Sequence, residues 1–436
     1  MSTTIAHPTP AERGRAVAAR VIAVLRTETG LARVALGALA LHTVDDAFLQ
    51  PNPGTSASDH LAGGLIPAAL LLGTAWAYPR LRAGVRAALA FLFAFFGLLS
   101  SVEGFYYASK VGPSGDDYSS LLAAPAAFVL IGVGAVALWK SRRTDDALWW
   151  RYPRRLLVTG GALVVVAVVA LPLTVSYVVT HVGRADVATA DLGAPYENVE
   201  FETSDGLTLK GWYIESKNGA AVISFPGRAS SQKRAKILAD HGYGVLLFDR
   251  RGEGESEGDP NLLGWKGERD VHAAVKFLQS RPDVDPGRIG GIGLSVGGEM
   301  MIEAAAESNA LKAIVSEGGS GRSVRDDLAN PGGRWDETLG SAIVTAGTAL
   351  STSDTPPADL KSLVRKIDNP VFFVYGAKGQ PAEKPANDEF YKVKRGPKEI
   401  WEVPGSKHMG GIDAQPAAYE KRVVGFFDRW LLKRSR

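Results

Sequence analysis

The sequence predicts two parts of different fold class. These are an α-helical membrane domain over residues 31–182 and an α/β domain with a mostly parallel, eight-stranded sheet over residues 195–436. Three observations predict this division. Residues 1–190 contain 27 charged residues, whereas the remaining 246 residues contain 68. The first part contains several long uncharged apolar runs. In the second part, short β-rich runs alternate with helical stretches, which is typical of a parallel sheet with crossover helices.

The overall composition excludes several classes of protein. The 436 residues are 46% hydrophobic, which excludes intrinsic disorder, and the net charge is only +3. No long basic run offers the concentrated Lys/Arg surface that nucleic acid requires, so we expect no nucleic-acid partner. The absence of cysteine excludes disulfides, Cys-ligated zinc, iron–sulfur clusters and thiol nucleophiles. We expect neither a metal nor another cofactor.

The first part is predicted to cross a membrane five times. A helix needs about 20 mostly apolar residues to span a bilayer. Four uncharged runs approach or exceed this length, at residues 61–78, 87–102, 121–139 and 156–180. A fifth candidate at residues 31–49 is weaker, because Asp45 and Asp46 lie in its second half. The basic tail over residues 1–30 is too long and polar to begin a signal peptide.

The basic residues indicate how these spans are oriented. Fourteen Lys and Arg residues lie in or beside the N-terminal tail, in the loop after the second span and in the loop after the fourth. The alternate flanks hold only Lys110 and Arg184. Because short cytoplasmic loops are enriched in Lys and Arg, the pattern predicts a multi-pass plasma-membrane protein with a cytoplasmic N-terminus. The α/β domain is then exoplasmic.

Several polar residues lie near the outer ends of the predicted spans. They are His42, Asp45, Asp46, Asp59, His60, Glu103, Asp116 and Asp117. Ionisable groups in spans are costly and often functional, so a metal or proton-linked site is one hypothesis. No ligand spacing, such as two histidines one helical turn apart, supports it. We expect hydrated groups that hold the outer loops together by hydrogen bonds.

The second part is predicted to contain eight strands and four principal helices. The strands are expected at residues 198–203, 207–214, 221–225, 244–248, 288–293, 313–316, 371–375 and 399–403. The helices are expected at residues 232–241, 266–279, 296–307 and 417–433. Asp205-Gly206 between the first two strands is typical of a hairpin turn. In a parallel sheet the functional site lies at the carboxyl ends of the strands.

Gly-x-Ser-x-Gly, a pattern that can carry a nucleophilic serine, occurs twice. The copy around Ser256 is polar and precedes no helix. The copy around Ser295 follows the strand at 288–293 and opens the helix at 296–307. Only the second has the strand–turn–helix context of a nucleophile elbow, in which a sharp turn exposes the serine hydroxyl above the sheet.

A nucleophilic serine needs a base, and three histidines lie in the second part. His241 ends one predicted helix and His272 lies inside another, where surface or packing roles are expected. His408 lies in the loop between the last strand and the C-terminal helix. That loop is at the carboxyl edge of the sheet, so His408 can reach Ser295 and accept its proton.

These motifs resemble the α/β-hydrolases, and within them the dienelactone-hydrolase and acyl-peptidase-like serine hydrolases. The resemblance covers residues 197–432 and rests on FDRRGEGES at 248–256, RIGGIGLSVGG at 288–298 and the His408 loop. It implies a nucleophilic serine, a histidine base and an oxyanion hole of two backbone N–H groups. Those N–H groups would belong to Val296 and to Arg228, which follows Pro226-Gly227 where the family usually has His-Gly.

The chain departs from this family at the acid of the triad. The family usually places an aspartate where Gly379 stands. Glu383, four residues later in the same loop, and Glu317, at the end of the preceding strand, can replace it. Glu383 is favoured because its loop is the family's usual source of the acid, and Glu317 stays the alternative. Either carboxylate can hold the imidazole tautomer.

Residues 318–370 form a long insertion that predicts a lid. An apolar face at helical spacing would come from Trp335, Leu339, Ile343, Val344 and Leu350. This face could cover an acyl or aromatic group of a substrate, or it could be ordinary core packing. Both interpretations are open.

The sequence favours a membrane-anchored serine hydrolase that cleaves an ester, thioester or amide bond through an acyl-enzyme. Its partners would be a small-molecule, acyl or peptide substrate and the lipid bilayer. One alternative is a catalytically idle hydrolase fold that serves as a binding or sensing module, which the missing aspartate motivates. Another is an acyltransferase with the same triad.

Overall fold

The structure is a computed structural model that describes residues 26–111, 117–141, 148–181, 187–329 and 334–432, together with residues 19, 23 and 115. Most of the basic tail, Asp116 and Arg184 lie outside these residues. The chain divides into two compact units: residues 1–51 with 56–162, and residues 52–55 with 163–436.

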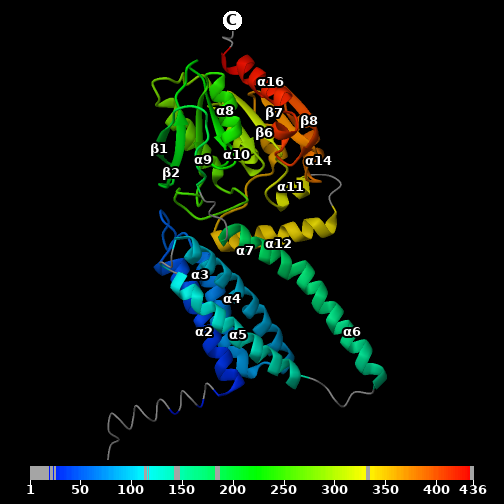
Figure 1. The fold of residues 1–436 in the computed structure, drawn as a ribbon. Coiled ribbons are helices and arrows are strands. Elements are labelled where there is room, and N and C mark those ends of the chain that lie inside the picture. The colour runs from blue at the N-terminus through cyan, green and yellow to red at the C-terminus, as the bar shows by residue number, and fades with distance from the viewer. Residues whose placement is uncertain are drawn as a thin grey trace, which may run out of the picture. The chain divides into compact units, whose positions relative to one another are not determined.

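The first unit is helical. Its helices are α2 (Glu28–Val44), α3 (Leu61–Ala77), α4 (Ala83–Val111), α5 (Asp117–Lys140) and α6 (Leu148–Val165), with short turns η1 (Asp45–Leu49) and η2 (Tyr78–Arg80). The packed interior consists mainly of alanine side chains, such as those of Ala32, Ala90 and Ala127. Large apolar side chains such as Leu70 and Phe128 are exposed. This distribution, with small side chains inside and large apolar ones outside, suits helices surrounded by lipid. Figure 1 shows where the helices of this unit lie in the chain.

Among the residues that the structure describes, four helices are long and apolar enough to cross a membrane: Leu61–Arg80, Ala83–Ser109, Asp117–Lys140 and Tyr152–His181. They coincide with the four stronger spans in the sequence. The weaker first span corresponds to α2, which is only 17 residues long and ends where Asp45 and Asp46 begin a π-helical turn. Two acidic side chains shorten its apolar stretch, so α2 is not among the four, and a fifth crossing stays a prediction.

Two of the polar residues expected near the outer ends of the spans, His42 and Asp45, share Ser119 as a hydrogen-bonding partner. Ser119 Oγ donates to Asp45 Oδ2 at 2.6 Å and lies 3.1 Å from His42 Nδ1. At the other end of α2, Glu28 pairs with Arg86 at 3.4 Å and with Lys140 at 2.5 Å. These contacts join the ends of α2, α4 and α5.

The second unit contains the sheet. It begins with the end of the last apolar helix, η3 (Val166–Ala170) and α7 (Leu171–His181). The strands are β1 (Glu197–Glu202), β2 (Thr208–Ile214), β3 (Ala221–Phe225), β4 (Gly244–Phe248), β5 (Ile289–Leu294), β6 (Ala313–Glu317), β7 (Val371–Lys378) and β8 (Lys398–Lys407). Their order is β1-β2-β4-β3-β5-β6-β7-β8. Only the pairs β1–β2 and β2–β4 are antiparallel, so the prediction of eight mostly parallel strands is confirmed.

Helices cover both faces of this sheet because the central strands are apolar on both sides. The helices are α8 (Gln232–Asp240), α9 (Gly267–Gln279), α10 (Val296–Glu307), α11 (Val324–Ala329), α12 (Trp335–Thr352), α13 (Leu360–Val364), α14 (Glu383–Val393), α15 (Gly411–Ala414) and α16 (Pro416–Phe427), with η4 (Asp428–Leu432) at the end. One hydrophobic core lies between the sheet and α9, α10, α13 and α14, and a second lies under α8 and α16 (Figure 1).

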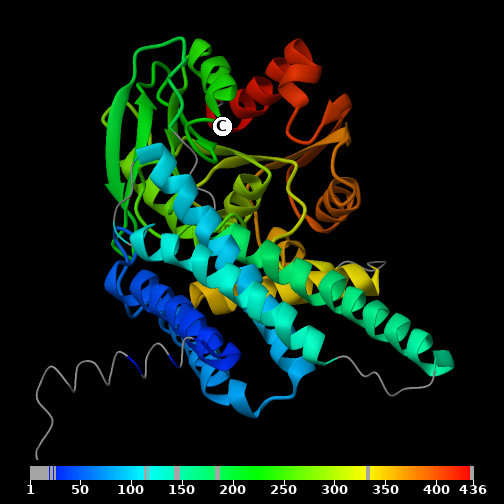
Figure 2. The same cartoon turned by 60° about the horizontal axis from the view of Figure 1, so that its bottom comes forward.

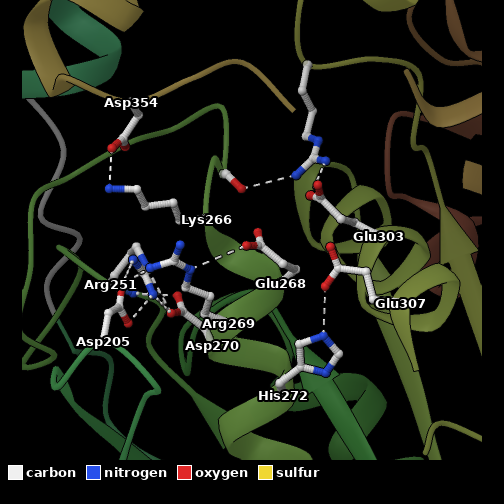
Figure 3. A network of polar contacts seen from close by, with 12 residues as sticks. Asp205, Arg251, Lys266, Glu268, Arg269, Asp270, His272, Glu303, Glu307 and Asp354 are labelled. Atoms are coloured by element: carbon white, nitrogen blue, oxygen red, sulfur yellow. Dashed lines mark hydrogen bonds and ion pairs between the residues drawn. The ribbon is translucent and has the colours of Figure 1, made fainter. Parts of the chain in front are cut away.

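A buried charge network fixes the loop after β4. Arg251 pairs with Asp270 at 2.7 Å and with Asp205 at 2.9 Å, as Figure 3 shows. Asp205 lies in the turn of the β1–β2 hairpin and Asp270 on α9. The network therefore connects the loop at residues 250–252 to the β1–β2 hairpin and to α9. Burial raises the pKa of Asp270 despite the nearby charge of Arg251.

Candidate active site

Ser295 lies on a sharp turn between β5 and α10. Its backbone has φ 49° and ψ −122°, a strained conformation for an L residue, and its N–H donates to the carbonyl of Glu317 at 2.7 Å. Glycine is required at Gly297, where a Cβ atom would lie 2.5 Å from Pro226 Cδ. Because the turn is this tight, the serine side chain projects from the end of the strand.

The other Gly-x-Ser-x-Gly copy has a different environment. Ser256 is fully buried, and its hydroxyl donates to the Asp249 carbonyl at 2.6 Å and accepts from the Lys210 N–H at 3.0 Å. The Ser256 hydroxyl therefore stabilises the loop after β4 through two backbone groups. Because Ser256 is buried, a substrate cannot reach this hydroxyl.

His408 follows β8 directly and lies beside the elbow. Its Nε2 atom is 3.0 Å from Ser295 Oγ. The other two candidates lie elsewhere: His241 contacts Glu420 at 2.9 Å, and His272 contacts Glu307 at 3.0 Å on the surface of α9 (Figure 3). Of the three histidines, only His408 is brought to the serine.

Glu383 contacts the opposite side of the His408 ring. It is the first residue of α14 and is buried, and its Oε1 atom lies 2.5 Å from His408 Nδ1. The N–H of Gln380 donates to the same oxygen at 2.6 Å. Burial opposes ionisation, but the hydrogen bonds from His408 and Gln380 outweigh it and lower the pKa of Glu383.

Gly379 explains how a residue four positions later reaches the histidine. A Cβ atom at this position would lie 2.7 Å from the carboxyl carbon of Glu383. The carboxylate therefore occupies the space that a side chain at position 379 would fill. Glycine where the family has aspartate leaves room for the glutamate.

Glu317, the alternative acid, is committed to other partners. Its Oε2 atom accepts from Arg234 Nη2 at 2.8 Å and from Tyr419 Oη at 2.6 Å, and its Oε1 accepts from the Gly411 N–H at 3.1 Å. Arg234 also donates to the Met409 carbonyl at 2.8 Å. This buried cluster holds Met409 and Gly411, one and three residues after His408, so Glu317 anchors the loop and does not orient the imidazole.

The two expected oxyanion donors have different environments. Val296 is the first residue of α10 and is partly exposed, and N–H groups in a first helical turn have no intrahelical acceptor. The Arg228 N–H instead donates to Asp249 Oδ1 at 2.9 Å, and its guanidinium pairs with Asp249 and Glu255. The resemblance to the hydrolase family assigned the second donor to Arg228 because this residue follows Gly227. The Asp249 carboxylate that accepts this N–H speaks against that role.

The next amide in this loop belongs to Ala229. Ala229 is exposed, and its N–H donates no hydrogen bond among the residues that the structure describes. Its N–H is an alternative candidate for the second donor. The sequence signal that could have identified it is Asp249, which begins the DRRG segment and faces this loop.

The described residues of the predicted lid form three helices, α11, α12 and α13. Of the five apolar residues expected on its face, Trp335, Leu339 and Leu350 are exposed, and Ile343 and Val344 are half-buried. None of the five belongs to the cores of the sheet domain. Core packing therefore does not account for this apolar stripe.

Comparisons with known proteins agree with the fold. Residues 189–402 match the X-Pro dipeptidyl-peptidase (S15) family. The chain is 37% identical over 129 residues to the thiohydrolase aneE of Aspergillus aculeatus, covering 28% of this chain and 41% of that protein. It is 23% identical over 241 residues to the uncharacterized protein YfhR of Escherichia coli K12, covering 53% and 80%.

Among solved structures, the chain is similar to the esterase Pf2001 of Pyrococcus furiosus, with 25% identity and a TM-score of 0.46, covering 57% of this chain and 98% of that one. It is also similar to the α/β-hydrolase GrgF of Penicillium, with 21% identity and a TM-score of 0.46, covering 55% and 100%. With the strand order, the elbow after β5 and the S15 match over residues 189–402, the C-terminal part of the chain is a domain of the α/β-hydrolase fold.

Proposed function

We propose that this protein is a membrane-anchored serine hydrolase that cleaves an ester, thioester or amide bond through an acyl-enzyme. The observation that carries the proposal is the continuous contact from Ser295 through His408 to Glu383, with distances of 3.0 Å and 2.5 Å. Three residues more than 20 positions apart in the sequence meet in the order that nucleophilic catalysis requires.

In this mechanism Ser295 Oγ attacks the substrate carbonyl carbon while its proton passes to His408 Nε2. Glu383 holds the imidazole in the required tautomer and stabilises the imidazolium. The developing oxyanion accepts hydrogen bonds from the N–H groups of Val296 and Ala229, each worth about 3–4 kcal/mol in comparable sites. The leaving alcohol, thiol or amine takes the proton from His408. Water then attacks the acyl-enzyme, His408 accepts its proton, and the carboxylic acid and free serine are released.

The idle-module alternative was motivated by the missing aspartate. Because Glu383 supplies a buried carboxylate at His408, that motivation is weakened. The acyltransferase alternative gains support from a relative: the polyketide transferase grgF of Penicillium is 35% identical over 130 residues, which cover 28% of this chain and 44% of that protein. The two activities differ only in whether water or another nucleophile attacks the acyl-enzyme.

A fluorophosphonate probe tests the proposal directly. Purified full-length protein should be labelled at Ser295, and Ser295→Ala should abolish the labelling, because only an activated serine attacks the phosphorus. Ser256→Ala serves as the matched control and should leave labelling intact if the variant folds. Absence of labelling of the wild type, or equal labelling of Ser295→Ala, would favour the idle module.

A second experiment separates acyl transfer from hydrolysis. Small alcohols are added to the reaction, and the amount of new ester is compared with the amount of free carboxylic acid.

A further inference from the structure

Helix α12 in the lid presents its apolar face outward. Its exposed or half-exposed apolar residues recur at helical spacing, as Trp335, Leu339, Ala342, Ala346 and Leu350. Trp335 is 78% exposed and Leu350 47% exposed. The buried side of the helix instead carries Thr345, Gly347 and Thr348. In a water-soluble protein the apolar stripe faces the core, so this arrangement is inverted.

The buried side of α12 packs on α7. At the crossing, a Cβ atom on Gly347 would lie 2.5 Å from Ser176 Oγ and 3.3 Å from Leu173 Cδ2, so glycine permits the close approach. Figure 2 shows α12 in yellow beside α7 in green, both in the same compact unit. The contact therefore fixes α12 to the last helix with the length and apolarity of a membrane span.

The crossing point lies near the end of that span. The continuous apolar helix is Tyr152–His181, and Arg154 lies at its start. About 20 residues cross the hydrocarbon core, so counting from residue 156 brings the core to an end near residue 175. The following residues include Ser176, Tyr177 and His181, and the last two rings stack at 4.1 Å. Tyrosine and polar residues are typical of the membrane–water interface. Gly347 therefore meets the span at interface depth.

The same region adjoins the catalytic residues. The Leu262 N–H donates to the carbonyl of Val179 in α7 at 2.8 Å. Two residues later, a Cβ atom on Gly264 would lie 2.5 Å from Val296 Cγ2, directly after the nucleophile. A short chain of contacts thus joins the end of the span to the elbow.

The lid segment starts beside the site. It leaves the sheet at Gly318, where a Cβ atom would lie 3.1 Å from His408 Cε1. At the other end of α12, Asp354 pairs with Lys266 at the start of α9 (Figure 3). Both α12 and Ser295 therefore lie at the carboxyl edge of the sheet.

We propose that the outward face of α12 lies in the membrane interface and that the substrate of Ser295 is an ester whose long acyl chain resides in the bilayer. The first half concerns the docking of α12. The second half rests on the proposed hydrolase function. An amphipathic helix that packs on the end of a candidate span, with its apolar side chains outward and the nucleophile at the same edge of the sheet, supplies both the contact with lipid and the route for an acyl chain.

The docking of α12 can be measured without any activity. Because the chain has no cysteine, single cysteines at Leu339 and Ala346 carry unique nitroxide labels in proteoliposomes of phosphatidylcholine and phosphatidylglycerol. Both labels should collide with dissolved oxygen and be shielded from a water-soluble nickel chelate. Glu337→Cys, on the opposite side of the same helix, is the matched control and should show the reverse. Accessibility of Leu339 and Ala346 labels to nickel overturns the proposal. Shielding from both reagents indicates a second protein chain there and overturns it as well.

The substrate class is tested with two esters of one leaving group, 4-methylumbelliferyl oleate in the vesicles and the water-soluble acetate. In Leu339→Lys/Leu350→Lys the ratio of oleate to acetate hydrolysis should fall about tenfold or more, since burying a leucine side chain is worth about 1.5–3 kcal/mol. Glu337→Lys adds a lysine to the polar side and should keep the wild-type ratio. An unchanged ratio in the double variant overturns the bilayer substrate.

Failure of the hydrolase proposal gives a different result. In that case the wild type hydrolyses neither ester and takes no fluorophosphonate label. The bilayer substrate then falls with the hydrolase, while the nitroxide measurement still decides whether α12 docks in lipid.

Discussion

The carboxylate that contacts His408 belongs to Glu383, four residues after the position where related hydrolases usually have an aspartate. The carboxylate nevertheless reaches the same side of the imidazole ring. Glu383 begins α14, and its longer side chain folds back over Gly379 to reach the imidazole. The Gln380 N–H and His408 both donate to one oxygen, while Oε2 is buried and has no hydrogen-bond partner among the described residues. A buried carboxylate that contacts the ring through one oxygen is suited to hold a histidine that becomes charged during the reaction.

Removing the charge of Glu383 should affect catalysis more than binding. Glu383→Gln should lower kcat by roughly 10²–10⁴-fold with little change in KM, because the amide cannot stabilise the imidazolium. Steady-state kinetics on a short 4-methylumbelliferyl ester measure this. Asp388→Asn, an exposed change on the same helix, is the control and should be near wild type. A Glu383→Gln enzyme with wild-type kcat would remove Glu383 from the triad.

The acid should be movable. Glu383→Ala empties the space over Gly379, and adding Gly379→Asp to it should recover at least about tenfold in kcat, because the new carboxylate points into the vacated position. Gly379→Asp alone should be inactive or poorly folded, since the two carboxylates would collide. If the double variant is no better than Glu383→Ala, a carboxylate at position 379 cannot act as the acid of the triad.

The pH dependence of stability follows from the lowered pKa of Glu383. A carboxylate with a depressed folded-state pKa stabilises the protein above its unfolded pKa, and that contribution is lost as the pH falls through the lower folded value. The difference in thermal midpoint between wild type and Glu383→Gln should therefore be constant at neutral pH and shrink below about pH 4. A difference that shrinks already between pH 7 and 6 would contradict the lowered pKa.

At the scale of elements, the loop after β8 is held by a buried cluster from three others. Arg234 on α8, Glu317 at the end of β6 and Tyr419 on α16 contact one another, and they bind Met409 and Gly411 of the loop. Burial and the Glu317 charge raise the pKa of Tyr419, so its hydroxyl keeps its proton. His408 is thus positioned by charges that do not touch it.

Substitutions that break this cluster should lower the thermal stability of the protein more than its kcat. Glu317→Gln leaves the buried Arg234 without its charge partner, and such losses are typically about 3–5 kcal/mol. The thermal midpoint should fall sharply, while the remaining folded enzyme keeps much of its kcat. Tyr419→Phe removes two hydrogen bonds to charged groups, each worth about 1.5–3 kcal/mol, but leaves the ion pair between Arg234 and Glu317 in place. A stable Glu317→Gln protein with a kcat as low as that of Glu383→Gln would transfer the acid role to Glu317.

At the scale of the whole molecule, one loop constrains the membrane topology. Residues 52–55, which precede the first of the four candidate spans, belong to the same compact unit as the hydrolase fold. Asn52 Nδ2 donates to Asp259 Oδ1 at 3.0 Å, and the Gly258 N–H donates to the Pro53 carbonyl at 2.9 Å. Two segments in contact lie on one side of a membrane, which requires an even number of crossings between them. Four spans satisfy this condition whether or not α2 crosses.

Single-cysteine labelling tests this topology. We expect Ser58→Cys and Asp240→Cys to react with a membrane-impermeant maleimide on intact cells, because the positive-inside bias places the hydrolase domain outside. Arg82→Cys, in the basic turn between two spans, should react only after permeabilisation. The reverse pattern would place the enzyme in the cytoplasm, and different sides for Ser58 and Asp240 would contradict the even number of crossings.

Features that depend on neighbouring residues in the chain were predictable from the amino-acid sequence. Apolar run length predicted the four long helices, and alternating strands and helices predicted the eight-stranded sheet. The elbow around Ser295 was predictable because its turn is made by residues within a few positions, and its context separated it from Ser256. The His408 loop was predictable because parallel strands bring their carboxyl ends to one edge.

Tertiary structure decided what depends on several segments at once. Sequence could not choose between Glu383 and Glu317, because the choice rests on Gly379 making room for one and on Arg234 and Tyr419 binding the other. The resemblance assigned an oxyanion donor to the backbone N–H of Arg228. In the structure this N–H donates to the carboxylate of Asp249, which follows β4. The sequence left the stripe on α12 open between a core and a lid, because one helical periodicity fits both. Only the packing of Gly347 on Ser176 turns that stripe outward, since the direction of an apolar face is set by what the opposite face contacts.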